Sequence, residues 1–293
     1  MKIGVLSIVK NEHRYLDEWI KYHLGIGVDK IYIFEDVGSL SHRDICDKYD
    51  SVECNSVLSI YSNEEKDTII NAKQNSLDRF GCQIKFFKDC LDYVRDNSDL
   101  DWVAYIDTDE FITLDSSDIV LSDLVQQYDD YNLVVLQWLN YNANGHITMP
   151  SGNVVQNYTT TCKLYTGRMM CKYASCKLLF NLHRWDKNKV LCNMHVPATI
   201  DGWCKTDFST DLNVPVYDKI YIRHYITKSF EEFCNKLFVR GQICVSQSLL
   251  NFFSFNKDIS REDPIVKSMM QDIYDKFMSD ELKFLPVVNN VIK

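Results

Sequence analysis

The stretch WVAYIDTDEF, residues 102–111, joins an apolar strand-like run to three carboxylates in four positions, Asp107, Asp109 and Glu110. Carboxylates packed this closely repel one another and resist removal from water, so the pattern indicates a nearby cation. Because residues two apart on a strand point the same way, Asp107 and Asp109 can reach one divalent ion. Hard ions such as Mg²⁺ or Mn²⁺ prefer such oxygen ligands. The alternative is an acid-rich turn that only caps a helix near residue 118.

Predicted strands and helices alternate through the first part of the chain. Short apolar runs rich in β-branched residues predict strands at 2–9, 30–36, 51–61 and 101–106, and helical spacing predicts helices at 67–80 and 82–96. This alternation is typical of an α/β fold, a mostly parallel sheet flanked by helices.

Polar clusters follow three of these predicted strands. They are Lys10-Asn11-Glu12, Glu35-Asp36 and the acids at 107–110. Ligands of such sheets bind outside the carboxyl ends of the strands. We therefore expect the three clusters to share one binding edge.

The second half of the chain has a looser pattern. It predicts a helix near 118–127, strands at 132–139 and 219–226, and helices at 229–250 and 262–279. We see no repeat or linker, so we expect one domain over 1–293. Its parts would be a nucleotide-binding half (1–115), an acceptor-side half (116–228) and a C-terminal helical segment (229–293).

Composition narrows the function classes. The 293 residues suit a sizeable core, and a formal net charge of −9 argues against a nonspecific nucleic-acid binder. No secretory leader or membrane span is visible, and eleven cysteines form no C-x-x-C pair, so we expect reduced thiols in a cytoplasmic protein. The apolar run at 249–255 either contacts a membrane that carries the acceptor or packs within the domain.

Three other kinds of site fit the sequence poorly. The turn VKNEHR at 9–14 lacks the glycines of a dinucleotide-binding loop, and it is not the glycine- and arginine-rich loop of a nucleotidyltransferase. A phosphate-binding P-loop is absent from the sequence. A haloacid-dehalogenase-type phosphatase would have threonine or valine at position 111, where this chain has Phe111.

Four segments, in this order, carry a resemblance over nearly the whole chain. They are VKNEHRYLDEWIKYHLGIGVDKIYIFEDVGS (9–39), DWVAYIDTDEFI (101–112), CKLLFNLHRWDKNKVLCNMHVP (176–197) and RHYITKSFEEFCNKLFVRG (223–241). Together they resemble nucleotide-sugar glycosyltransferases of the GT-A fold, in particular the family 92 and family-2-like (DUF23-type) group. The resemblance implies a GT-A-like, Rossmann-like sheet with C-terminal helices.

The resemblance also implies roles for residues at the three strand ends. Asn11, Glu12 and Asp36 match positions that hold the nucleoside. Asp107 matches the first acid of a D-x-D motif, which faces ribose and metal. Asp109 matches the second acid, which binds the metal directly.

Late in the chain, the resemblance points to a histidine and a lysine. His224 would complete the metal shell, with His195 as the alternative ligand, and Lys228 would bind the phosphates. A neutral imidazole suits a metal, and an ammonium group suits a diphosphate. Lys177 and Arg240 are further candidates for phosphate or acceptor contacts.

The implied reaction is a metal-dependent, inverting transfer from a nucleoside diphosphate sugar, with UDP-sugar favoured, to a glycan, glycolipid or glycoprotein, as in polysaccharide biosynthesis. It requires a general base near the acceptor hydroxyl. Glu110 and Asp201 are weak candidates, and Glu110 has the alternative of a structural acid. A sugar-phosphate nucleotidyltransferase and a non-catalytic carbohydrate- or partner-binding protein are the other hypotheses.

Overall fold

A computed structural model of the chain describes residues 1–74, 79–116, 118–162, 176–186, 191–193, 196–199, 202–203, 219–236 and 249–278. The chain divides into two compact units. The first unit comprises Met1–Trp138 and Met170–Arg223, and the second comprises Leu139–Met169 and His224–Lys293.

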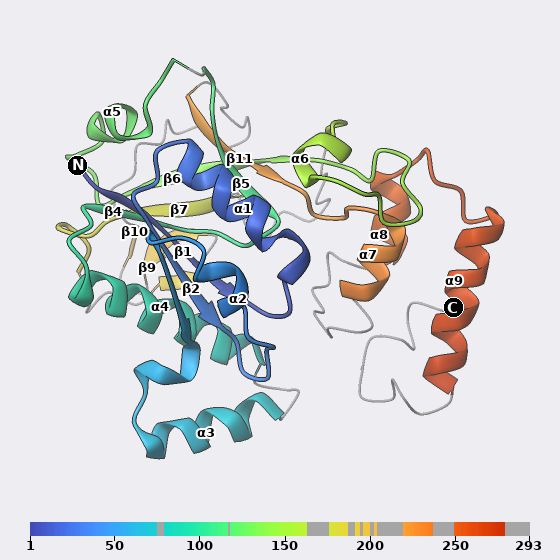
Figure 1. The fold of residues 1–293 in the computed structure, drawn as a ribbon, viewed down its shortest axis with the longest axis horizontal. Coiled ribbons are helices and arrows are strands. Elements are labelled where there is room, and N and C mark those ends of the chain that lie inside the picture. Colours follow the sequence, from blue (N-terminus) through green and yellow to red (C-terminus); the bar gives the residue numbers. More distant parts are fainter. Residues whose placement is uncertain are drawn as a thin grey trace. The chain divides into compact units, whose positions relative to one another are not determined.

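An eight-stranded sheet, in the order β3-β2-β1-β4-β7-β6-β11-β5, organises the first unit (Figure 1). Its strands are β1 (Ile3–Val9), β2 (Lys30–Glu35), β3 (Val52–Ser56), β4 (Trp102–Tyr105), β5 (Glu110–Leu114), β6 (Leu133–Asn140), β7 (Cys176–Asn181) and β11 (Ile220–His224). β1 to β4 pair in parallel, whereas β7 runs antiparallel to both β4 and β6. The predicted α/β sheet is confirmed.

Helices follow the first three parallel strands, and residues 57–60, which were predicted as part of a strand, form a 3-10 helix. In the first unit they are α1 (His13–Gly25), α2 (Arg43–Cys46), the 3-10 helix η1 (Val57–Ile60), α3 (Asn63–Gln74), α4 (Arg79–Asn97) and α5 (Leu121–Gln126). A small antiparallel sheet joins β8 (Leu191–Asn193), β9 (Val196–Thr199) and β10 (Gly202–Trp203).

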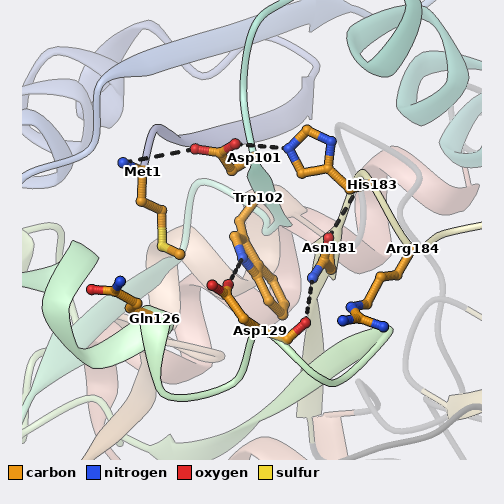
Figure 2. Close-up of a pocket in the computed structure, with 8 residues that line it drawn as sticks. All are labelled: Met1, Asp101, Trp102, Gln126, Asp129, Asn181, His183 and Arg184. Atoms are coloured by element: carbon orange, nitrogen blue, oxygen red, sulfur yellow. Dashed lines mark hydrogen bonds and ion pairs between the residues drawn. The ribbon is translucent and has the colours of Figure 1, made fainter.

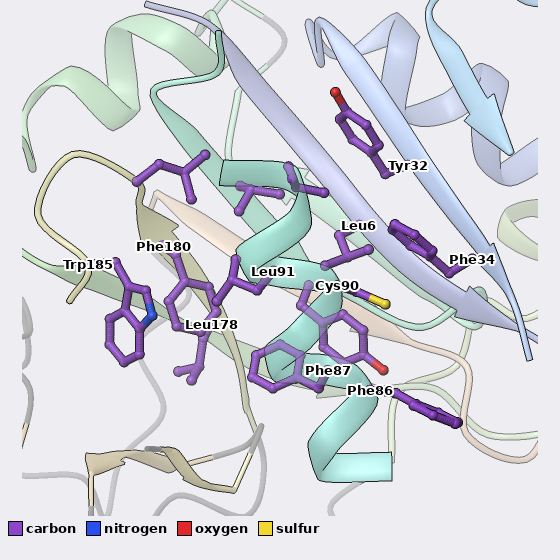
Figure 3. Close-up of a cluster of buried hydrophobic side chains, with 14 of the residues drawn as sticks. Leu6, Tyr32, Phe34, Phe86, Phe87, Cys90, Leu91, Leu178, Phe180 and Trp185 are labelled. Carbon is purple, nitrogen blue, oxygen red and sulfur yellow. The ribbon is translucent and has the colours of Figure 1, made fainter. Parts of the chain in front are cut away.

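The core of the first unit lies between α4 and one face of the sheet (Figure 3). The helix presents apolar side chains three and four residues apart to strands β1, β4 and β7. The ring of Phe87 lies 4.5 Å from Tyr105 and 5.8 Å from Phe180, between centroids. Trp185 packs on Phe180 at 5.1 Å. The core therefore extends to Tyr105, the last residue of β4, and holds in place the strand end that precedes the acids.

The second unit has its own smaller core. Its helices are α6 (Val154–Asn157), α7 (Phe230–Cys234), α8 (Leu249–Phe255) and α9 (Pro264–Met278). Phe252 is fully buried, and its ring lies 5.1 Å from Phe230 and 4.9 Å from Phe233. The apolar run at 249–255 thus uses Phe252 for packing. No helix in the described part of the chain is long and apolar enough to cross a membrane.

Two side chains of α1 fasten this helix to β5. The Trp19 indole N–H donates to the carbonyl of Glu110 at 2.8 Å. His23 Nδ1 donates to the carbonyl of Trp19 at 2.8 Å, and His23 Nε2 accepts from the N–H of Ile112 at 3.2 Å. These partners require a neutral imidazole, and complete burial lowers the pKa of His23 to about 3. The backbone of the acid-bearing segment is therefore held to α1 at two residues, Glu110 and Ile112.

His23 should make the protein less stable in acid. Its pKa is lower in the folded chain than in the unfolded chain, so below about pH 6.5 the unfolded state binds a proton that the folded state does not. The free energy of unfolding should then fall by about 1.4 kcal/mol per pH unit from pH 6.5 towards 3, from this residue alone. Urea unfolding of the wild type and of His23→Gln between pH 7 and pH 5 measures it. Equal pH slopes in both proteins would show that the prediction is wrong.

Candidate functional site

The parallel strands bring three polar segments to one edge of the first unit's sheet. The N–H of Asp36 donates to the carbonyl of Val9 at 2.8 Å, so the ends of β2 and β1 lie side by side. The N–H of Ile106 donates to the carbonyl of Leu6 at 3.1 Å, which extends the β4–β1 pairing towards the acids. The shared edge predicted from the sequence is thus confirmed for the turns that follow β1, β2 and β4.

Asn11 ties the turn after β1 to the loop after β2. Its N–H donates to Ser39 Oγ at 3.2 Å, and its Oδ1 accepts from the N–H of Leu40 at 2.9 Å. Its backbone has φ 55, in the left-handed region. Asparagine tolerates this region better than most residues because its short side chain bonds locally. The identity of Asn11 therefore sets the shape of this turn.

His42 also holds the turn after β1 in place. The N–H of Glu12 donates to His42 Nε2 at 2.9 Å, and His42 Nδ1 lies 3.3 Å from Glu35 Oε1. The His42 ring is fully buried and stacks on His13 at 4.0 Å between centroids. Burial, and then the neighbouring His13, lowers the pKa of His42, which keeps Nε2 as an acceptor. The network fixes the backbone of Glu12 at the binding edge.

A buried lysine faces the acids that follow β4. Lys177 Nζ lies 2.7 Å from Asp107 Oδ2 and 3.6 Å from Glu110 Oε2. The N–H of Asp107 donates to Glu110 Oε2 at 2.9 Å. The ammonium group also lies 4.9 Å from the centre of the Tyr105 ring, within the range of a cation–π contact. A cation is thus built into the protein at this point, as the acid pattern indicated.

Burial dominates the electrostatics of this cluster. Burial raises the pKa of Glu110 well above its usual value, and the positive charge of Lys177 opposes that rise. Burial lowers the pKa of Lys177, but Asp107 and Glu110 outweigh it and leave the pKa above its usual value. Burial and the charges of Asp107, Glu110 and Asp36 keep the pKa of Tyr105 well above its ordinary value. Lys177 therefore stays charged, in keeping with its carboxylate partners.

The sequence did not predict that Lys177 and Glu110 are both completely buried. Lys177 is completely buried, so its side chain is not a surface contact for phosphate or acceptor. Glu110 is also completely buried and binds the backbone of Asp107, as the structural alternative expected. The apolar neighbours of Lys177 in β7 were a signal that it lies inside. Nothing in the sequence near His42 marked it as a partner of Glu12.

Possible metal ligands occur in each unit. In the first unit, Asp109 and Glu110 offer carboxylate oxygens, and Asp109 is 9% exposed. In the second unit, the candidate is His224, the last residue of β11. His224 Nδ1 lies 2.9 Å from Asn140 Oδ1, so Nδ1 donates and the lone pair of the ring is on Nε2. Imidazole binds metals in this neutral form, with its other nitrogen held by a hydrogen bond.

Lys228 has a strained backbone in the second unit. Its φ is 52, and it directly precedes the residue that caps α7, Ser229. The N–H of Ser229 donates to Tyr158 Oη at 3.1 Å and to Glu232 Oε2 at 3.2 Å. The capping box of α7 therefore holds Lys228 in a left-handed conformation that few lysines adopt. Such strain occurs often at functional sites.

A pocket of about 410 Å³ opens at the other end of β4 (Figure 2). Its lining includes Asp101, Trp102, Asp129 and His183, and His183 Nε2 lies 2.7 Å from Asp101 Oδ1. Asp101 precedes β4, whereas Asp107 follows it. This pocket is therefore separate from the edge that bears the candidate residues.

Three predicted residues, His195, Asp201 and Arg240, lie outside the described residues. Their roles stay predictions.

Comparison with known families identifies the chain. A model of glycosyltransferase family 92 matches residues 6–276. The chain belongs to this family. Together with the mixed sheet, this confirms the predicted GT-A-like class of fold. A search of the curated proteins gave no match.

Several solved structures of transferases are distantly similar. The mannosyltransferase Ktr4p from S. cerevisiae is 13% identical with a TM-score of 0.32, over 50% of this chain and 42% of that one. The galactosyltransferase LgtC, with donor and acceptor sugar analogues, is 14% identical with a TM-score of 0.33, over 63% and 61%. Glucosyl-3-phosphoglycerate synthase from Mycobacterium tuberculosis, with Mn²⁺, UDP and phosphoglyceric acid, is 12% identical with a TM-score of 0.34, over 62% and 56%. The chain spans less than two thirds of the length of each.

The left-handed backbone at Asn11 can be tested with two substitutions. Asn11→Gly and Asn11→Ala both remove the side-chain bond to Leu40, but only alanine retains the steric cost of a left-handed φ, about 1 kcal/mol. We expect Asn11→Ala to be less stable than Asn11→Gly by about that amount, measured by urea unfolding. If alanine is as stable as glycine there, the turn does not have the conformation described.

Proposed function

We propose that this family 92 member transfers a sugar from a nucleoside diphosphate sugar, with UDP-sugar as the donor, to a glycan or glycoconjugate acceptor. The transfer would use Mn²⁺ or Mg²⁺ and invert the anomeric centre. The observation that carries the proposal is the edge where the turns after β1 and β2 meet the acids after β4. Ligands of open α/β sheets bind at such an edge.

The nucleoside would lie against Asn11, Glu12 and Asp36. Asn11 donates to Ser39 and accepts from Leu40, and these hydrogen bonds support the assignment because they hold the turn in one shape before a ligand arrives. The bond between the N–H of Glu12 and His42 does the same for the next residue. A binding edge that is already ordered loses less conformational entropy on binding.

The metal ion would be held by Asp107, Asp109 and His224, with His195 as the alternative to His224. Asp107 and Asp109 supply oxygen atoms of the kind that Mn²⁺ and Mg²⁺ prefer. The bond from His224 to Asn140 supports the third assignment, because it leaves the lone pair on Nε2. When bound, the ion would neutralise negative charge on the diphosphate leaving group.

Lys228 would bind the phosphates and stabilise the negative charge that develops as the glycosidic bond breaks. Its support is the strained backbone that the Ser229 cap holds in place. The general base is unassigned. Glu110 is completely buried and bound to the backbone of Asp107, which does not favour it, and Asp201 is the other candidate. The acceptor would be a glycan, glycolipid or glycoprotein of a polysaccharide pathway.

Thermal unfolding with nucleotides tests the donor site. The protein would be melted with UDP, GDP, CDP or dTDP, each with Mn²⁺ or with EDTA. A ligand at about 100 times its dissociation constant stabilises the folded state by about 2.7 kcal/mol. We expect stabilisation by UDP with Mn²⁺ and loss of that stabilisation with EDTA.

Two aspartate variants serve as a matched pair for this experiment. Asp109→Asn removes one proposed metal ligand and should abolish the UDP–Mn²⁺ shift. Asp50→Asn makes the same change at an exposed position and should leave the shift unchanged. No stabilisation of the wild type by any of the four nucleotides would refute the donor site. A UDP shift that persists in Asp109→Asn would refute the assigned metal ligand.

A further inference from the structure

The interior position of Lys177 demands an explanation. Its side chain is completely buried, and in the sheet it pairs with Leu136 of β6. The next three residues of β7, Leu178, Leu179 and Phe180, are apolar and buried. Burying an ammonium group costs several kcal/mol, and replacing a buried ion pair by apolar residues is often neutral or stabilising. The fold by itself therefore does not require a lysine here.

The contacts of Lys177 favour one carboxylate over the other. The 2.7 Å from Nζ to Asp107 Oδ2 is a charge-assisted hydrogen bond, whereas the 3.6 Å to Glu110 Oε2 exceeds hydrogen-bonding distance. Glu110 in turn holds the N–H of Asp107. Asp107 is thus fixed at its side chain by Lys177 and at its backbone by Glu110.

Part of the Asp107 side chain remains accessible to a ligand. Its side chain is 42% exposed, while those of Lys177 and Glu110 are 0% exposed. One side of the Asp107 carboxylate therefore faces the buried ammonium group and the rest faces the open edge of the sheet. A ligand can meet Asp107 but not Lys177.

We propose that Lys177 is a positioning residue that orients the carboxylate of Asp107 for the metal ion and nucleotide, without touching either. The inference rests on the proposed function, because it concerns the same donor site. The alternative is that Lys177 only offsets the burial of Glu110. The two differ in which carboxylate needs the lysine.

A double variant separates the alternatives. Lys177→Met removes the charge and leaves the buried acid Glu110 without the neighbouring ammonium group, so it is combined with Glu110→Gln, whose side-chain oxygen can still accept from the N–H of Asp107. Glu110→Gln alone, which keeps the bond from Lys177 to Asp107, is the control. Thermal melting without ligand reports folding, and calorimetric titration with Mn²⁺ and UDP reports binding.

We expect the double variant to melt like Glu110→Gln but to bind UDP–Mn²⁺ at least about tenfold more weakly than Glu110→Gln does, the loss typical when a supporting partner of a metal ligand is removed. Equal affinity of the double variant and the control would overturn the role of Lys177 and leave the proposed function intact. Absence of UDP–Mn²⁺ binding to the wild type would instead overturn the proposed function, and this inference with it.

If the double variant does not fold, a second measurement on the wild type tests the inference. In a crystal structure of the wild type with Mn²⁺ and UDP, Lys177 Nζ should stay within about 3 Å of Asp107 Oδ2 while another part of that carboxylate meets the ligand. Separation of the two atoms in the loaded protein would overturn the inference.

Discussion

The ion pair between Lys177 and Asp107 is the constraint on which the candidate site depends. The acids after β4 can sit at the end of a buried strand because a cation is already present among them. Without Lys177, the completely buried Glu110 and the partly exposed Asp107 would lie close together without that positive charge beside them, which is unfavourable. The protein therefore supplies one positive charge from within, and in the proposed function a divalent ion would supply a second at the edge of the sheet.

The packing of the first unit also fixes the backbone on both sides of these acids. The aromatic core under α4 ends at Tyr105, whose ring also contacts Lys177. On the other side, Trp19 and His23 of α1 bond the backbone of β5 at Glu110 and Ile112. The segment between β4 and β5 is thus fixed at both ends, as a site with a defined geometry requires.

The sequence predicted those parts of the fold that depend on local pattern. Alternating apolar runs located the strands, and the polar residues after them located the binding edge, because parallel strands must end on the same side. The sequence did not predict that Lys177 is buried, and nothing in it marked His42 as a partner of Glu12. Each has a partner far away in the sequence: Lys177 meets Asp107, 70 residues earlier, and His42 meets Glu12, 30 residues earlier. Such pairings depend on tertiary packing, which periodicity does not encode.

Mn²⁺ scatters X-rays anomalously, so its position can be observed directly in crystals of the protein grown with Mn²⁺ and UDP. We predict an anomalous peak within about 2.5 Å of the Asp109 carboxylate, a typical distance for a bound divalent ion. The nucleotide should lie along the turns that follow β1 and β2. A peak in another place, such as the pocket beside Asp101, would contradict the assignment of the donor site to this edge of the sheet.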